Sequence, residues 1–251
     1  MNKPSLYLNL ATEFFDLDKP KASAEEYAFF HHYIAQAQGP ILEPMCGSGR
    51  YLIPYLEEGF DIDGFDASPF MMKSLRSKCA QKNLTPHVWE QFLEGVPTTK
   101  LYNLIFIPDS SFCLFLDPAH VKMCLQKIYS LLQEGGSFVF DLETVYAIPE
   151  ATGVWQGKAH KKPDDTIVIC STLPLPIENS IATVICRYEL IDKTEILKTE
   201  MEYFQIKLYY PTEMDAILRD VGFSQIKRVA AYDYNSTPSA QDYTIVYECI
   251  K

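Results

Sequence analysis

The stretch from residue 41 to residue 72 constrains the fold more than any other part of this 251-residue chain. It opens with a short apolar run that ends at Glu43, and a tight turn of small residues, Cys46–Gly49, follows. A helix-like segment then leads to a second short strand that ends at Asp66. A strand, a glycine turn, a helix and a second strand with an acidic tip make one βαβ unit. Such a unit carries a nucleotide site at its switch point.

Three features of this unit indicate which nucleotide would bind. Gly47 and Gly49 have no Cβ, so the turn can be sharp and a ligand can approach the backbone. Asp66 lies 19 residues after Gly47 (66 − 47), where a carboxylate accepts hydrogen bonds from both hydroxyls of an adenosine ribose. Leu52 replaces the third glycine of a dinucleotide fingerprint, and Glu43 would repel a pyrophosphate but suits the ammonium of a methionine moiety. The pattern therefore favours S-adenosylmethionine over NAD.

Two segments resemble known motifs. Residues 41–50 resemble motif I, and residues 64–72 resemble motif II, of the class I S-adenosylmethionine-dependent methyltransferases. The resemblance covers residues 20–145 by motifs and residues 211–251 by pattern alone. It implies an α/β, Rossmann-like, doubly wound fold: a mostly parallel seven-stranded sheet with an antiparallel last strand.

The same resemblance implies which residues hold the cofactor. They are Glu43, Cys46, Gly47, Ser48, Gly49, Arg50, Asp66, Ala67, Ser68, Met71, Gln91, Phe92 and Pro108. The family usually has an acidic residue before an apolar one at the adenine, where this chain has Gln91 and Phe92. The side-chain oxygen of Gln91 can still accept a hydrogen bond from the adenine amine, and Glu90 is the alternative residue for this contact. Met72 is the alternative to Met71 beside the adenosine.

Residues 150–210 differ from the rest of the chain because helical periodicity stops there. Three runs alternate or are rich in β-branched residues: 166–170, 182–188 and 199–206. Such runs predict antiparallel strands joined by hairpins. We expect residues 150–210 to be an inserted β subdomain over the acceptor site. Residues 1–149 and 211–251 would then form the Rossmann-like cofactor domain.

The N-terminal segment and the loop after residues 101–107 are implied to meet the methyl acceptor. Residues 1–22 are expected to be irregular, with an aromatic residue that closes over the sulfonium through cation–π attraction. The alternative is that these aromatic residues only seal the edge of the core. The expected substrate-pocket residues are Tyr7, Phe14, Asp109, Ser111 and Tyr203.

Glu143 is the candidate general base. It emerges at the carboxyl edge of the predicted fifth strand, where ligands bind in such sheets. A hydroxyl or a protonated amine needs a base nearby before it can attack a methyl group. Tyr203 and His160 are further candidates, and each of the three residues has a structural alternative.

Composition narrows the function classes. The net charge of −11 disfavours a nucleic-acid partner. No run of 18 apolar residues exists, and the N-terminus lacks the pattern of a signal peptide, so a cytoplasmic protein without a membrane partner is expected. The seven cysteines are odd in number and include no Cys-x-x-Cys, so neither a disulfide framework nor a metal site is expected.

The sequence thus predicts an S-adenosylmethionine-dependent methyltransferase (EC 2.1.1.-) that acts on a small molecule by in-line displacement. An NAD(P)-dependent oxidoreductase is one alternative, disfavoured by Leu52 and Glu43. A cofactor-binding protein without transferase activity is another, and side chains from 150–210 would then fill its acceptor pocket. A protein acceptor stays open, and the acceptor atom and the oligomeric state have no sequence signal.

Overall fold

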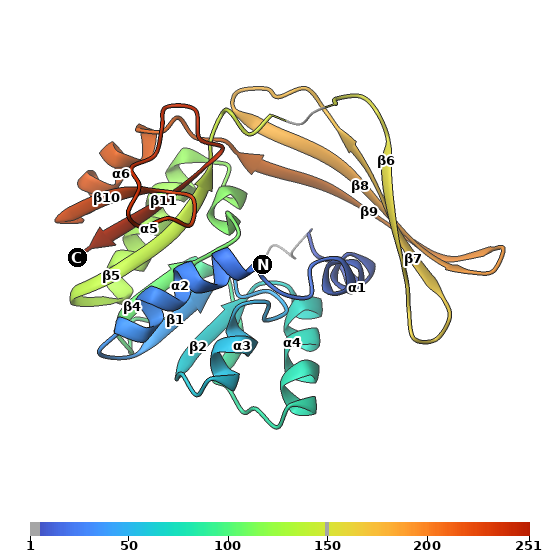
Figure 1. The fold of residues 1–251 in the computed structure, drawn as a ribbon, viewed down its shortest axis with the longest axis horizontal. Helices are drawn as coiled ribbons and strands as arrows, with labels where there is room; N and C mark the ends of the chain where they lie inside the picture. The colour runs from blue at the N-terminus through green and yellow to red at the C-terminus, as the bar shows by residue number, and fades with distance from the viewer. Residues whose placement is uncertain (1–5, 149–150) are drawn as a thin grey trace.

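Seven strands form the central sheet of the computed structural model, which describes residues 6–148 and 151–251 (Figure 1). They are β1 (Ile41–Pro44), β2 (Ile62–Asp66), β3 (Val88–Glu90), β4 (Tyr102–Ile107), β5 (Leu132–Glu143), β10 (Gln225–Ala230) and β11 (Thr244–Ile250). Their order is β10-β11-β5-β4-β1-β2-β3. All neighbouring strands among β1, β2, β3, β4 and β5 pair in parallel, whereas β11 is antiparallel to both of its neighbours. This confirms the predicted fold class, including the antiparallel last strand.

Helices cover both faces of this sheet. They are α2 (Ala24–Gln36), α3 (Leu52–Glu57), α4 (Pro69–Gln81), α5 (Pro118–Leu131) and α6 (Glu213–Val221), with short 3₁₀ turns η1 (Leu93–Gly95) and η2 (Ser111–Leu114). One apolar cluster joins the sheet to α2, α3 and α4, and another joins it to α5 and α6. Ser23, Ser68 and Asp117 cap the helices that follow them, each by accepting a backbone N–H hydrogen bond. Each cap stabilises the start of its helix, because a Ser or Asp side chain satisfies an otherwise unpaired amide.

A second, antiparallel sheet lies between β5 and α6 in the sequence. Its strands are β6 (Gln156–Lys161), β7 (Ile167–Pro174), β8 (Ile181–Asp192) and β9 (Glu195–Lys207), in the order β6-β7-β8-β9. Figure 1 shows this sheet reaching past the central sheet on the side of the N-terminal helix. The three expected strands are present, whereas β6 was not predicted. Most β6 side chains are exposed, so its sequence has no apolar alternation that could have revealed it.

Residues 9–18 form helix α1 (Asn9–Asp18), which corrects the expectation that residues 1–22 are irregular. The residue before this helix is Leu8, so no local side chain caps it. Glutamates of β9 take that role: Leu8 N donates to Glu202 Oε1 at 3.0 Å and Leu10 N donates to Glu200 Oε2 at 2.6 Å. The sequence next to α1 therefore contains no capping residue from which the start of this helix could be predicted. Residues 1–5 of that expectation lie outside the described residues.

Within residues 6–148 and 151–251, no helix combines the length and the apolar character that crossing a membrane requires.

Candidate cofactor and acceptor site

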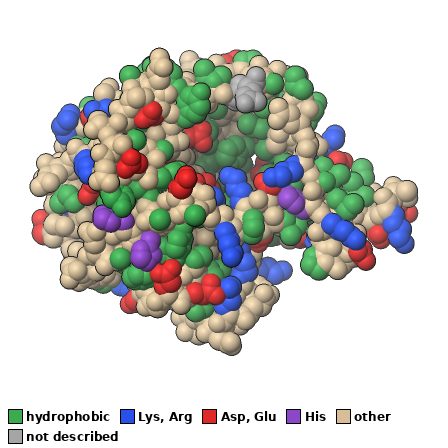
Figure 2. All heavy atoms as spheres, in the orientation of Figure 1, with side chains coloured by type: hydrophobic (Ala, Val, Ile, Leu, Met, Phe, Trp, Pro, Cys, Tyr) green, Lys and Arg blue, Asp and Glu red, His purple; other side chains and the backbone are tan. Residues whose placement is uncertain are grey.

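A cavity of about 720 Å³ opens at the carboxyl ends of β1, β2, β4 and β5. Residues from α1 and β9 also line it, so the second sheet and the N-terminal helix close one side. Figure 2 shows the molecule hollowed here, with apolar side chains inside the hollow and basic side chains along its rim. Clefts at the carboxyl ends of parallel strands are where ligands bind in doubly wound sheets.

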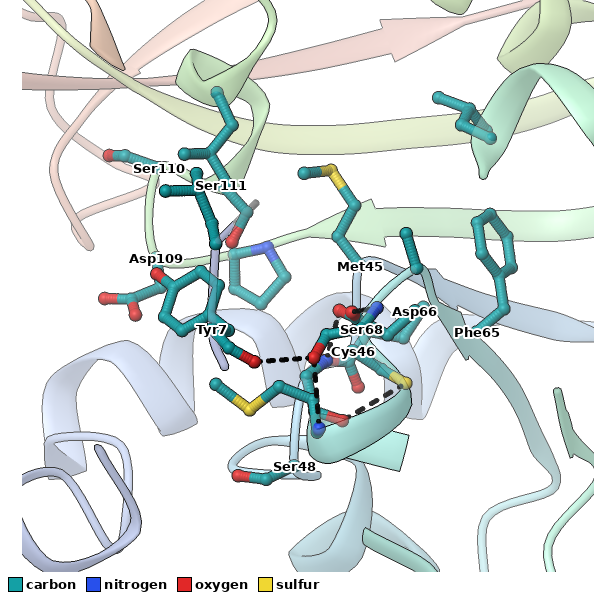
Figure 3. A pocket seen from close by; sticks show the side chains of 18 of the residues that line it. Tyr7, Met45, Cys46, Ser48, Phe65, Asp66, Ser68, Asp109, Ser110 and Ser111 are labelled. Carbon is teal, nitrogen blue, oxygen red and sulfur yellow. Dashed lines mark hydrogen bonds between the residues drawn. The ribbon is translucent and has the colours of Figure 1, made fainter. Parts of the chain in front are cut away.

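The glycine turn forms the floor of this cavity. Gly47 and Gly49 have φ angles of 52° and 87°, in the left-handed region that favours glycine. A Cβ on Gly49 would lie 2.8 Å from the Ile53 side chain, so this position has no room for another residue. The Asp66 carboxylate accepts hydrogen bonds from Gly47 N at 2.9 Å and from Ser68 N at 2.7 Å. These bonds lock the turn to the tip of β2 (Figure 3).

Asp66 and Glu43 are two buried carboxyl groups beside the turn. Burial raises the pKa of Asp66, and the backbone N–H bonds lower it in part. Glu43 is 2% exposed, and its Oε2 has no hydrogen-bond partner among the described residues. Burial and then repulsion by Asp66 raise the pKa of Glu43 well above its ordinary value. A cationic group placed next to Glu43 would satisfy this oxygen and favour the ionised form.

Arg50 brings a guanidinium to the same cavity. Its Nη2 donates to Glu26 Oε2 at 3.0 Å, and its Nη1 lies 2.8 Å from Asp109 Oδ2. Arg50 Nε is buried and donates no hydrogen bond to any described residue. A guanidinium with a free donor can bind a further carboxylate. Glu43 and Arg50 therefore fit the ammonium and the carboxylate of an amino-acid moiety.

The loop after β4 places Asp109 at the cavity wall. Asp109 and Ser110 have φ angles of 59° and 51°, two successive non-glycine residues in the left-handed region. Such strain persists only where surrounding contacts fix it, and it concentrates at functional sites. Here Asp141 fixes it, because its Oδ2 accepts from Ser110 N at 2.9 Å and from Tyr232 OH at 3.2 Å. Figure 3 shows the Tyr7 ring beside Asp109.

Glu143, at the end of β5, also lines the cavity. Burial raises its pKa, the positive charge of Lys19 lowers it in part, and Asp109 raises it further. Among the described residues its carboxylate takes part in no hydrogen bond and no ion pair, whereas Asp109 has both Arg50 and Lys19 within 4 Å. At this end of the cavity, the Glu143 carboxylate is therefore free to interact with a ligand.

Most of the predicted site residues meet at this cavity. Those that line it are Tyr7, Glu43, Cys46, Gly47, Ser48, Arg50, Asp66, Ala67, Ser68, Met71, Gln91, Phe92, Pro108, Asp109, Ser111 and Glu143. Of the predicted alternatives, Met72 is fully buried in the core, and Glu90 does not line the cavity. The roles of these residues toward a cofactor or an acceptor stay predictions.

Three predicted residues do not reach the cavity lining, which corrects their expected positions. Gly49 faces Ile53 and the core behind the turn. Phe14 lies on the opposite face of α1, where its ring packs 5.9 Å from that of Tyr188. Tyr203 points away from the cavity and is 57% exposed.

Several lining residues were not predicted. Phe15 and Lys19 come from α1 and its C-cap, and Phe204 and Ile206 come from β9. Recognition of α1 as a helix would have placed Phe14 and Phe15 on different faces. Strand alternation would likewise have placed Tyr203 and Phe204 on opposite faces of β9, but it does not say which face is inward.

Glu94, His120 and Cys124 form a group whose possible metal-ligand atoms lie within 4.8 Å of one another. Glu94 and His120 also line the cavity. Burial, followed by repulsion from Glu94, raises the pKa of the Cys124 thiol to about 12. The expectation that the chain holds no metal stays a prediction.

Comparison with known proteins gives a consistent picture. Residues 41–136 match the family model described as a methyltransferase domain. "Putative methyltransferase GWCH70_2453" of Geobacillus sp. (strain WCH70) is 25% identical over 150 residues, which are 59% of this chain and 60% of that protein. The chain thus spans less than two thirds of that relative's length.

Solved structures resemble the whole chain. A S-adenosylmethionine-dependent methyltransferase from Clostridium acetobutylicum ATCC 824 has a TM-score of 0.75 and 17% identity, over 96% of each chain. The sugar N-methyltransferase KedS8 from Streptoalloteichus sp ATCC 53650 has a TM-score of 0.76 and 15% identity, over 100% of this chain and 98% of that chain. At such identities the likeness shows a shared fold.

Proposed function

We propose that the chain is a class I S-adenosylmethionine-dependent methyltransferase that methylates a small-molecule acceptor by in-line displacement. The match of residues 41–136 to a methyltransferase domain and the fold shared with such enzymes support this proposal. One observation carries the proposal. A single cavity joins Asp66, Glu43 and Arg50, which suit the three polar parts of the cofactor, to a second polar end at Asp109 and Glu143. A cofactor and an acceptor could therefore lie end to end.

The cofactor end is built for a zwitterionic nucleoside. The ribose hydroxyls would donate to Asp66, the ammonium would neutralise Glu43, and the carboxylate would accept from the free Nε of Arg50. Gln91, Phe92 and their neighbours would then enclose the adenine. S-adenosylmethionine supplies an electrophilic methyl group on a sulfonium when it is bound.

The protein's own contribution would be positional. A nucleophile held about 3 Å from the methyl carbon, in line with the bond to sulfur, needs little further help if water is excluded. We propose that residues 150–210 are an inserted subdomain that covers the acceptor and excludes water. Residues 1–149 and 211–251 would be the cofactor domain. The sugar N-methyltransferase with the same fold supports a small acceptor. The cytoplasmic location and the absence of a nucleic-acid or membrane partner stay predictions.

Calorimetric titration with S-adenosylhomocysteine, with NAD and NADP in parallel, tests the cofactor assignment. We expect micromolar binding of S-adenosylhomocysteine and no binding of either nicotinamide nucleotide. Binding of a nicotinamide nucleotide instead would mean that the glycine turn holds a pyrophosphate. Binding of none of the three would contradict the proposed function.

Asp66→Ala should remove most of the cofactor affinity, because it deletes the carboxylate that accepts from the ribose. Hydrogen bonds to a charged group contribute about 1.5–3 kcal/mol each, so S-adenosylhomocysteine should bind about 10–100-fold more weakly or worse. Asp61→Ala is a matched control, because Asp61 is an exposed acid just before the same strand. Circular dichroism would verify that the turn, which Asp66 also anchors, still folds. Unchanged affinity in Asp66→Ala would exclude this role for Asp66.

A further inference from the structure

We infer that the methyl acceptor is an amine, whose nitrogen lies between the carboxylates of Asp109 and Glu143 and the aromatic rings of Tyr7, Phe15 and Phe204. The inference rests on the proposed function and names the substrate class of the same site. It is drawn from the shape and charge of the cavity beyond the cofactor end.

An aromatic wall lines this end of the cavity. The ring centroids of Tyr7 and Phe15 are 5.9 Å apart and their planes meet at 82°. The centroids of Tyr7 and Phe204 are 6.4 Å apart and their planes meet at 81°. The three rings come from the segment before α1, from α1 and from β9, and all three line the cavity. The face of an aromatic ring attracts a cation, and Lys19 Nζ already lies 6.0 Å from the centroid of Phe15.

Two carboxylates complete this end, and they are not equivalent. Asp109 lies 2.8 Å from Arg50 Nη1 and 3.9 Å from Lys19 Nζ, so its charge is largely compensated. Glu143 is partly buried and has no such partner among the described residues. We therefore assign Asp109 to the binding of the ammonium and Glu143 to the removal of its proton.

The groups that face Glu143 come from several elements. Lys19 at the C-cap of α1 and Asp109 after β4 are the charged ones. Cys113 of η2 accepts the backbone N–H of Glu143 through its sulfur, at 3.3 Å. The second sheet contributes the apolar side chains of Phe204 and Ile206 to the cavity wall. Burial raises the pKa of Glu143, which makes it a stronger base than an exposed glutamate.

The chemistry of an amine fits this charge pattern at each stage. An ammonium is attracted by both carboxylates and by the rings. Transfer of its proton to Glu143 leaves a neutral amine, whose lone pair forms the new N–C bond. The C–S bond breaks with its electrons on sulfur, so S-adenosylhomocysteine and a methylated ammonium form, and Glu143 then releases the proton to water. A phenolate or a carboxylate would instead place an anion beside Glu143, which forms no ion pair with a described residue, and this costs energy.

The test uses three probes of one shape: benzylamine, benzyl alcohol and benzoate, each titrated into the protein loaded with S-adenosylhomocysteine. We expect benzylamine to bind at least about tenfold more tightly than the other two. Phe204→Leu should weaken benzylamine by about 2–5-fold and leave benzyl alcohol unchanged, because cation–π attraction contributes about 0.5–1 kcal/mol. Equal binding of the three probes, or a preference for benzoate, would overturn the inference.

Methyl transfer to benzylamine, followed by mass spectrometry, separates the two carboxylates. Glu143→Gln should lower kcat about 100–1,000-fold with little change in KM and should abolish the rise of kcat with pH, whereas Glu143→Asp should restore part of both. Asp109→Asn should mainly raise KM. Glu134→Gln, an exposed glutamate on the same strand, is the control. An unchanged pH profile in Glu143→Gln would overturn the base assignment.

The two proposals fail differently. If S-adenosylhomocysteine binds but benzylamine shows no preference, only the amine inference falls. If S-adenosylhomocysteine does not bind, the proposed function falls as well.

Discussion

At the scale of single residues, Asp141 and Glu143 of β5 have different environments. Asp141 is fully buried and does not line the cavity, yet it holds Ser110 and thereby the loop that carries Asp109. Glu143, two residues later, points into the cavity without a partner among the described side chains. Asp141 therefore supports the structure of the site, whereas Glu143 can contact a ligand in it.

Asp141→Asn should flatten the pH dependence of stability. Burial, followed by repulsion from Asp109, raises the pKa of Asp141 from 3.8 to about 7. The folded state therefore keeps a proton that the unfolded state loses. This contribution is full below pH 4 and is lost as the pH rises through about 7, a change of about 2–4 kcal/mol. Asparagine cannot titrate but can still accept from Ser110. Urea unfolding at pH 5 and pH 8 would measure the change, and an equal loss of stability with pH in both proteins would contradict the raised pKa.

At the scale of elements, α1 connects the two sheets. Its N-terminal amides are capped by Glu200 and Glu202 of β9. Near its other end, Asp16 accepts from Ser48 Oγ and from Ser74 Oγ, both at 2.5 Å. Ser48 belongs to the glycine turn, so α1 ties the second sheet to the cofactor end of the cavity.

Leu10→Ala should destabilise the protein by about 2–5 kcal/mol, the usual cost of emptying a fully buried leucine site. Leu10 is 0% exposed and packs with residues of β7 and β8. Leu197→Ala, at a position of β9 that is 53% exposed, is the matched control and should change the stability by less than about 1 kcal/mol. Chemical unfolding of both variants would measure the difference. A small effect of Leu10→Ala would mean that α1 is only loosely attached to the second sheet.

At the scale of the whole molecule, the site exists because two sheets and α1 meet around one hollow (Figures 1 and 2). The central sheet supplies the glycine turn and the acidic strand ends, and the second sheet supplies apolar cover. A ligand in this cavity would contact both units, so its binding should stabilise both together.

S-adenosylhomocysteine at 100 times its dissociation constant should stabilise the folded state by about 2.7 kcal/mol. For a chain of this size that corresponds to a rise in Tm of about 5–10 °C. Differential scanning calorimetry would measure the rise, and Asp66→Ala should show little or none at the same concentration. Hydrogen exchange should slow in both the glycine turn and β9. Protection of the glycine turn alone would contradict coupling between the two units.

Sequence patterns predicted those parts of the fold that local chemistry decides. The turn at Gly47 follows from backbone rules within a few residues, and the parallel sheet follows from apolar runs. For the same reason most of the expected lining residues, which lie at strand ends, do meet in one cavity.

The sequence by itself determined the βαβ unit with its glycine turn and acidic strand tip, because glycine conformations and the placement of Asp66 depend only on nearby residues. The tertiary structure alone decided which residues face the acceptor end. The backbone before helix α1 is held by Glu202, 194 residues away. In the helix Phe15 lines the cavity, whereas Phe14 packs against the second sheet. Strand β9 likewise presents Phe204 and exposes Tyr203 only because the second sheet packs against α1. Contacts between such distant segments leave no periodic pattern in either segment. The residues at the acceptor end of the cavity come from these segments, so the sequence alone could not identify them.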